Sequence, residues 1–242
     1  MINELEAIVL KYNSVAMEYL RLDNFKDSQV LLRKAEEILN NDETEIIPNR
    51  LKLLGITLNN LGCFYKKRKQ PQVALSFLKR ALDVELQTES DYLDLAGSYL
   101  NICVVYSSLN KHNQALSCAK RSLDLLKRTK DSENFSSDKT VTLLTSMVIV
   151  HFNVGVELEY LKQFSEALEF YETGYELSAM ELGSRHPLTL TLSDAGEKLS
   201  KKIQQSKKAT QSNFRNSIRS QKFSYGAQYR LPSVGRGVRR SL

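Results

Sequence analysis

The sequence predicts an all-α fold, a solenoid of four stacked helix pairs followed by a capping helix and a basic extended tail. Three observations lead to this prediction. One pattern of small and aromatic residues occurs four times within residues 1–209, and repetition at fixed offsets is typical of solenoids. Apolar residues recur there at spacings of three and four, the period of an amphipathic helix. From about residue 210 this pattern ends and basic residues dominate.

The clearest copy of the pattern has a small residue, Gly62, followed three residues later by Tyr65 and then by small residues at Ala74 and Ala81. Small side chains at fixed offsets let two helices approach closely, so each copy predicts a helix-turn-helix unit. The other copies place comparable residues at the same offsets: Ala16, Tyr19, Ser28, Leu32 and Ala35; Cys103, Tyr106, Ala115, Ala119 and Ser122; Gly155, Leu158, Ala167, Tyr171 and Gly174.

This pattern resembles the tetratricopeptide repeat (TPR) family, whose unit has small residues at its eighth, twentieth and twenty-seventh positions and a tyrosine-like residue at its eleventh. The resemblance covers residues 2–209 and implies a right-handed solenoid. It places the four repeats near 9–42, 55–88, 96–129 and 148–181.

The steps between the eighth positions are 46, 41 and 52 residues, longer than the standard unit of about 34. Long repeats of this kind resemble those of kinesin light chains and of the LGN/Pins family. The phrase Leu58-Asn59-Asn60-Leu61-Gly62 is similar to one in kinesin light chains.

Nine helices are expected from the apolar periodicity and from residues typical of helix ends. Pro48 and Pro187 fit the first turn of a helix, where proline is accommodated. The polar segment 131–137 predicts the longest loop within the solenoid. In chain order, we expect the helices at 2–21, 24–41, 48–68, 71–87, 91–109, 111–129, 138–161, 163–182 and 187–209.

The last of these helices is expected to cap the array, because a terminal unit needs one polar side. Its apolar stripe comprises Leu188, Leu192, Ala195, Leu199 and Ile203. Its other face carries Glu197, Lys198, Lys201 and Lys202. The domains predicted are therefore a solenoid over 1–209, with its capping helix at 187–209, and a tail over 210–242.

Charge is divided unevenly along the chain. The last 42 residues hold 11 of the 34 Lys and Arg residues and none of the 28 Asp and Glu residues. A segment of this composition buries too little apolar surface to fold alone. Its charge suits an acidic partner surface such as a tubulin-like filament, and its aromatic residues also suit stacking on RNA. The candidate anchor residues are Arg215, Arg219, Lys222, Phe223, Tyr225, Tyr229, Arg230, Arg236, Arg239 and Arg240. A solubilising tail without a partner is the alternative.

A groove for a peptide follows from the resemblance. The first helix of each TPR unit lines a concave face, and the sixth position of the repeat is Ser14, Asn60, Asn101 and Asn153 in the four units. An amide side chain both donates and accepts hydrogen bonds, so it can pair with the backbone of an extended peptide. Solvated asparagines without a ligand are the alternative interpretation. The other candidate groove residues are Asn59, Lys66, Lys67, Val104 and Phe152.

No catalytic or metal-binding pattern is apparent. His112, His151 and His186 are scattered, and the three cysteines show no C-x-x-C spacing; we interpret Cys63, Cys103 and Cys118 as small packing residues. We expect no signal peptide and no membrane span, because the apolar stretch 147–156 is too short. An enzyme, a cofactor and a metal are not expected.

The sequence thus predicts a non-enzymatic scaffold that binds a protein segment in its groove and belongs to a larger complex. Its basic tail is expected to anchor it to an acidic assembly, in the first instance a microtubule or axoneme. The alternative is an RNA-associated component of a ribonucleoprotein. The expected location is the cytoplasm, with the cytoskeleton or cilium as the setting.

Overall fold

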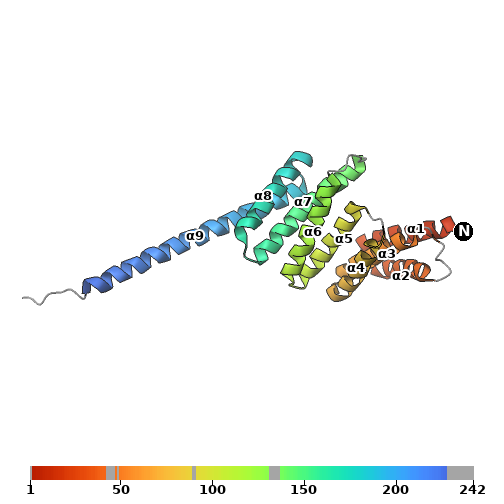
Figure 1. Ribbon diagram of the computed structural model, residues 1–242, viewed down its shortest axis with the longest axis horizontal. Coiled ribbons are helices and arrows are strands. Elements are labelled where there is room, and N and C mark those ends of the chain that lie inside the picture. Colours follow the sequence, from red (N-terminus) through yellow and green to blue (C-terminus); the bar gives the residue numbers. More distant parts are fainter. Residues whose placement is uncertain (1, 42–46, 48, 89–90, 131–136, 228–242) are drawn as a thin grey trace, which may run out of the picture. The chain divides into compact units, whose positions relative to one another are not determined.

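The computed structural model of the chain describes residues 2–41, 47, 49–88, 91–130 and 137–227, and all regular structure in these ranges is helical (Figure 1). The helices are α1 (Ile2–Arg21), α2 (Phe25–Asn40), α3 (Arg50–Lys67), α4 (Pro71–Glu85), α5 (Tyr92–Ser108), α6 (His112–Lys130), α7 (Ser137–Tyr160), α8 (Phe164–Glu181) and α9 (Pro187–Ala227). The expected all-α class is confirmed.

Every expected helix end lies within two residues of the observed one, except the end of α9. The prediction that an extended tail begins at 210 is wrong for residues 210–227, which continue α9. Neither proline nor glycine occurs between 197 and 225, so no residue there stops a helix. Residues 228–242 lie outside the described part of the chain.

The helices pack in consecutive pairs, α1 with α2, α3 with α4, α5 with α6 and α7 with α8. Successive pairs then stack through contacts such as α2 with α3, α4 with α5 and α6 with α7. Residues 1–196 form one compact unit, and residues 197–242 form a second. The pairwise stacking in the first unit is the arrangement that the repeated pattern predicts.

Small residues of the pattern stand where two paired helices touch. A Cβ atom added at Gly62 in α3 would lie 2.5 Å from Leu78 of α4, and one at Gly155 in α7 would collide with the ring of Tyr171 in α8. Ala74, also of the pattern, is fully buried. The side chain that each glycine lacks is therefore replaced by a large apolar residue of the partner helix.

The turn inside each pair repeats as well. Asp23, Lys69, Asn110 and Lys162 have left-handed backbone angles, with φ between 56° and 63°, and each lies at the same offset from the small residue of its repeat. The next residue donates its N–H five residues back, as in Asn24 to the Tyr19 carbonyl at 2.9 Å. This Schellman geometry satisfies carbonyl groups left open at the helix end.

Helix α7 forms part of the core of the first unit. By length and composition alone, its segment Lys139–Tyr160 is sufficient to cross a membrane, contrary to the expectation from 147–156. In the structure, Val148, Val154 and Leu158 are fully buried, and α7 packs against α6 and α8. Its apolar character is thus accounted for by burial between neighbouring helices.

Buried His151 of α7 predicts a pH dependence of stability. Its Nδ1 lies 2.7 Å from the Met147 carbonyl oxygen, and burial lowers the pKa of His151 below its usual 6.5. Below about pH 6.5 the unfolded chain therefore binds more protons at this position, so stability is lost as pH falls from there through the lowered pKa. Urea unfolding at pH 7.5 and 5.5 measures the loss. The variant His151→Gln is expected to show a smaller loss, and an equal loss in both proteins would contradict the assignment.

Candidate functional site

Asparagines of neighbouring first helices bond to one another. Asn60 of α3 donates from Nδ2 to Oδ1 of Asn13 in α1 at 2.8 Å. Buried Asn13 in turn donates to the Val9 carbonyl at 3.0 Å and to the Thr57 hydroxyl at 2.9 Å. An amide network therefore joins the first two repeats. Both the donor and the acceptor group of its buried residue, Asn13, form hydrogen bonds.

The same kind of bond joins the second repeat to the third. Asn101 of α5 donates from Nδ2 to Oδ1 of Asn59 in α3 at 3.1 Å, and Asn59 donates to the Ser98 hydroxyl at 3.0 Å. Lys66 of α3 donates to Oδ1 of Asn101 at 3.3 Å. Asn59 and Asn101 thus hold each other in fixed orientations.

A simple rule describes this ladder. The fifth position of one repeat bonds to the sixth position of the next, first as Asn13 to Asn60 and then as Asn59 to Asn101. In the third repeat the fifth position is Leu100, which offers no polar group, so Asn153 has no hydrogen-bond partner among the described residues. Asn13 and Asn59, at the fifth position, carry this signal in the sequence. Asn59 was predicted as a groove residue, whereas Asn13 was not.

A hollow of about 330 Å³ lies beside the ladder. It brings together three predicted groove residues, Asn59, Asn60 and Asn101, with residues of α4 and α7. The lining residues are Lys52, Ile56, Asn59, Asn60, Glu85, Leu93, Asp94, Gly97, Asn101, Thr142 and Ser146. We call this space the hollow, and we call the surface formed by α1, α3, α5 and α7 around it the groove.

The remaining predicted groove residues do not line the hollow. Lys67 donates to the Leu20 carbonyl and pairs with Asp23 at 2.8 Å, so it closes the C-terminal end of α1. Val104 is exposed, and the ring of Phe152 lies 5.9 Å from that of Tyr171. Asn153 is likewise outside the hollow. The side chains of all the tail anchor candidates lie outside the described residues.

Glu85 is the functional candidate that the sequence did not indicate. It ends α4 with only 8% of its surface exposed. Its Oε1 accepts from the Ser98 hydroxyl at 3.0 Å, whereas its buried Oε2 has no hydrogen-bond partner among the described residues. Burial raises the pKa of Glu85, the Ser98 hydrogen bond lowers it, and the charge of Asp94 raises it further.

The cysteines behave as packing residues. Cys103 is buried and the other two are half-buried, and none is paired. Burial raises the pKa of Cys63 and of Cys118, and it raises that of Cys103 to about 12. Thiols with raised pKa values are poor nucleophiles and poor metal ligands. No cluster of three potential metal ligands occurs among the described residues.

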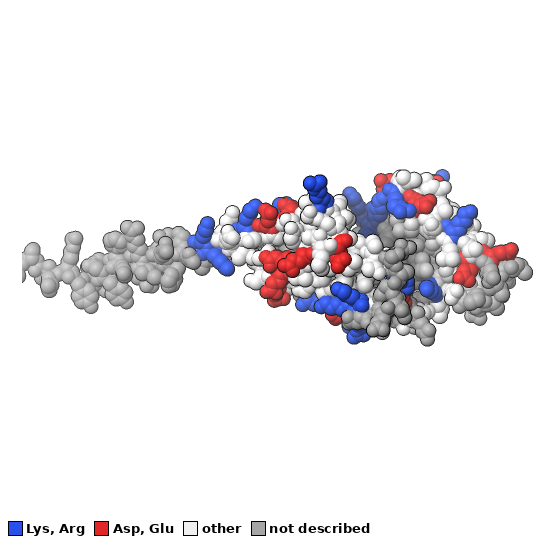
Figure 2. Space-filling view, turned by 90° about the horizontal axis from the view of Figure 1, so that it is seen from above, with Lys and Arg blue, Asp and Glu red and all other residues white. Residues whose placement is uncertain are grey.

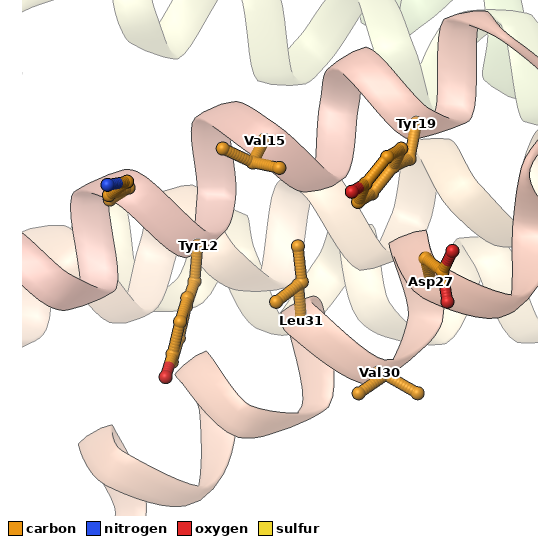
Figure 3. Close-up of a pocket in the computed structure, with 7 residues that line it drawn as sticks. Tyr12, Val15, Tyr19, Asp27, Val30 and Leu31 are labelled. Atoms are coloured by element: carbon orange, nitrogen blue, oxygen red, sulfur yellow. The ribbon is translucent and has the colours of Figure 1, made fainter.

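A second hollow of about 330 Å³ lies between α1 and α2, lined by Lys11, Tyr12, Val15, Tyr19, Asp27, Val30 and Leu31 (Figure 3). Its walls are mainly apolar, in contrast to the amide-rich hollow beside the ladder. On the face drawn in Figure 2, acidic and basic side chains are both present over the helix pairs.

Comparison with known proteins assigns the class. Residues 53–128 match the sequence profile of the tetratricopeptide repeat family. Residues 53–128 therefore consist of TPR units, and the helix pairs on either side of them have the same pairwise packing. No curated protein matches it closely enough to be counted as a relative.

Solved structures share the fold at low sequence identity. One is of a putative kinesin light chain with nearly identical TPR-like repeats from Podosopora anserina, with a TM-score of 0.63 and 17% identity over 88% of this chain and 93% of that one. Another is of BtubC (BKLC) from P. vanneervenii, with a TM-score of 0.68 and 15% identity over 98% of this chain and 88% of that one. These likenesses define the fold.

Proposed function

We propose that the solenoid is a non-catalytic scaffold that holds an extended segment of a partner protein in its groove. TPR units are protein-interaction repeats, and in this chain we assign the binding of the segment to the groove. The observation that carries it is the hollow, where Asn59, Asn60 and Asn101 converge beside open space. Amides fixed in place lose little conformational entropy when a ligand binds.

Backbone recognition follows from the groups that the ladder leaves available. Asn60 uses its Nδ2 on Asn13, and its Oδ1 has no hydrogen-bond partner among the described residues. This oxygen can accept from a peptide N–H. Asn153, further along the groove, keeps both an acceptor and donors for the same purpose. Exposed Val104 and Ile56 add apolar surface for side chains of the segment.

Replacing Asn60, Asn101 and Asn153 together by alanine is expected to weaken peptide binding markedly, because each lost hydrogen bond contributes about 0.5–1.5 kcal/mol. Helicity should be preserved, since alanine favours helices. Calorimetry with 12-residue peptides selected by display against the wild-type protein measures the change. Asn113→Ala, at an exposed position of α6, is the matched control. Equal affinity of the triple variant and the control would remove the asparagines from the mechanism.

The basic end of the chain is our second site. We propose that residues 210–242, which contain no Asp or Glu, anchor the scaffold to an acidic assembly. The tail charge and the kinesin-light-chain-like phrase favour a cytoskeletal assembly linked to microtubules, and hence a cytoplasmic or ciliary setting. Aromatic residues among the arginines favour RNA of a ribonucleoprotein as the alternative partner.

Deleting residues 211–242 removes seven positive charges and should abolish co-sedimentation with microtubules. The first compact unit ends at Gly196, so the truncated protein is expected to melt within a few degrees of the wild type. Sedimentation at two salt concentrations measures the anchor, and nuclease treatment of a pull-down tests the RNA alternative. A truncated protein that pellets as well as the intact chain would overturn the anchor.

A further inference from the structure

We propose that the hollow receives a positively charged side chain, arginine or lysine, of the bound segment, and that Glu85 and Asp94 are the anionic groups that pair with it. This inference rests on the proposed function and specifies its ligand. Glu85 and Asp94 both line the hollow. The central part of the groove thus binds a segment that carries a basic side chain.

One carboxylate oxygen of Glu85 lacks a hydrogen-bond partner among the described residues. A buried polar atom without a partner costs free energy, and a buried charge costs more. Ser98 satisfies only Oε1, at 3.0 Å, and Oε2 has no partner among the described residues. A guanidinium or ammonium group in the hollow supplies a compensating charge and a donor towards which the carboxyl group of Glu85 can turn.

Two glycines leave space around Glu85 and in the hollow beside it. A Cβ atom added at Gly97 of α5 would meet nothing within 4 Å, whereas one added at Gly55 of α3 would lie 3.1 Å from Cγ of Glu85. Gly55 therefore makes room for the carboxylate, and Gly97 leaves room for a ligand. Asp94 and Asn101 lie three residues before and four residues after Gly97, on the same face of α5.

The other residues that line the hollow suit a basic side chain as well. The side-chain oxygen Oδ1 of Asn60 and the hydroxyl group of Ser146 can accept hydrogen bonds. They therefore suit the five donors of a guanidinium group. Ile56 and Leu93 offer apolar surface for the aliphatic stem of the side chain.

One cation, Lys52, also lines the hollow. Its charge acts on Asp91, whose pKa is lowered chiefly by the hydrogen bond from Lys139, with a smaller contribution from Lys52. The two acidic residues that line the hollow, Glu85 and Asp94, outnumber this one cation. A negatively charged ligand is disfavoured by Glu85 and Asp94.

The test uses the full chain and capped pentapeptides, acetyl-Ala-Ala-X-Ala-Ala-amide, in which X is arginine, lysine, citrulline, leucine or glutamate. The side-chain amide NMR signals of Asn59, Asn60 and Asn101 report binding. We expect the arginine peptide to bind at least tenfold more tightly than its uncharged citrulline isostere, and the glutamate peptide to bind most weakly. Citrulline binding as tightly as arginine would overturn the proposal.

Two variants separate ligand binding from folding. Glu85→Gln should reduce the affinity for the arginine peptide at least tenfold, while the melting temperature stays equal or rises because a buried charge is removed. Gly97→Leu should block all the peptides by filling the hollow, since its β-carbon would meet nothing within 4 Å. Glu176→Gln, exposed on α8, is the control. An unchanged arginine preference in Glu85→Gln would overturn the proposal.

The outcomes also distinguish the inference from the proposed function. Peptides that shift the asparagine signals equally for every X would leave the groove as a binding site and remove the carboxylate pair from it. Peptides that shift none of these signals, for any X, would contradict both proposals.

Discussion

Replacing Gly62 by leucine is expected to lower the free energy of unfolding by about 3 kcal/mol, at the upper end of what overpacking costs. The β-carbon alone would lie 2.5 Å from Cγ and Cδ2 of Leu78 and 3.4 Å from the Ala74 carbonyl oxygen. Leu78 and Ala74 are both buried, so neither α4 nor its side chains can move aside easily. Urea unfolding followed by circular dichroism measures the loss.

A second glycine in a first helix supplies the control. Gly97→Ala adds a methyl group that meets nothing within 4 Å, and alanine in a helix is favoured over glycine by about 1 kcal/mol. This variant should therefore be as stable as the wild type or more stable. If Gly62→Leu also unfolded like the wild type, α3 and α4 would not approach as described, and the repeat register would be incorrect.

Replacing His112 by alanine is the other change with a large expected effect, a loss of about 3 kcal/mol. His112 begins α6, and its Nδ1 lies 2.8 Å from Oε2 of Glu157 in α7, whose side chain is 2% exposed. Its ring also stacks on Tyr160 at 4.1 Å between centroids. Alanine leaves the carboxylate buried without this partner and removes a contact between the third and fourth repeats.

A double-mutant cycle with Glu157→Gln isolates the contribution of this pair. The cost of His112→Ala should be smaller when position 157 carries no charge, because the neutral amide is less costly to leave unpaired. His112→Asn, which can place a donor near the former Nδ1, should restore part of the loss. Equal costs in both backgrounds would mean that the ring contact alone matters.

The helix pairs were predictable because their determinants are local. Small residues such as Gly62 and Gly155 recur at fixed offsets, and Pro187 stands at the start of α9 as expected, whereas Pro48 lies outside the described residues. The end of α9 was not predictable from its apolar stripe, because helix propensity continues beyond the last residue of that stripe, Ile203. A stripe indicates what a helix buries, and it does not indicate where the helix stops.

The candidate site was predictable only in part. Asn60 and Asn101 were found because they share one position in the repeat. The bonds that Asn60 and Asn101 donate to Asn13 and Asn59 were not predicted, because they connect different positions of successive repeats. This offset depends on how the pairs stack. Glu85 gave no periodic signal, since its burial against Gly55 and Ser98 arises only when α3, α4 and α5 have assembled.

Photocrosslinking from the hollow shows whether a partner segment lies in the groove. A benzoylphenylalanine replaces Ile56, which lines the hollow and is 36% exposed, or Val73 of α4, which lies outside the hollow and is 40% exposed. After irradiation in the native cell, mass spectrometry identifies the crosslinked peptides. We predict that position 56 captures one short segment of a partner and that position 73 does not. Capture of that segment equally from both positions, or from position 73 alone, would contradict the groove as the binding site.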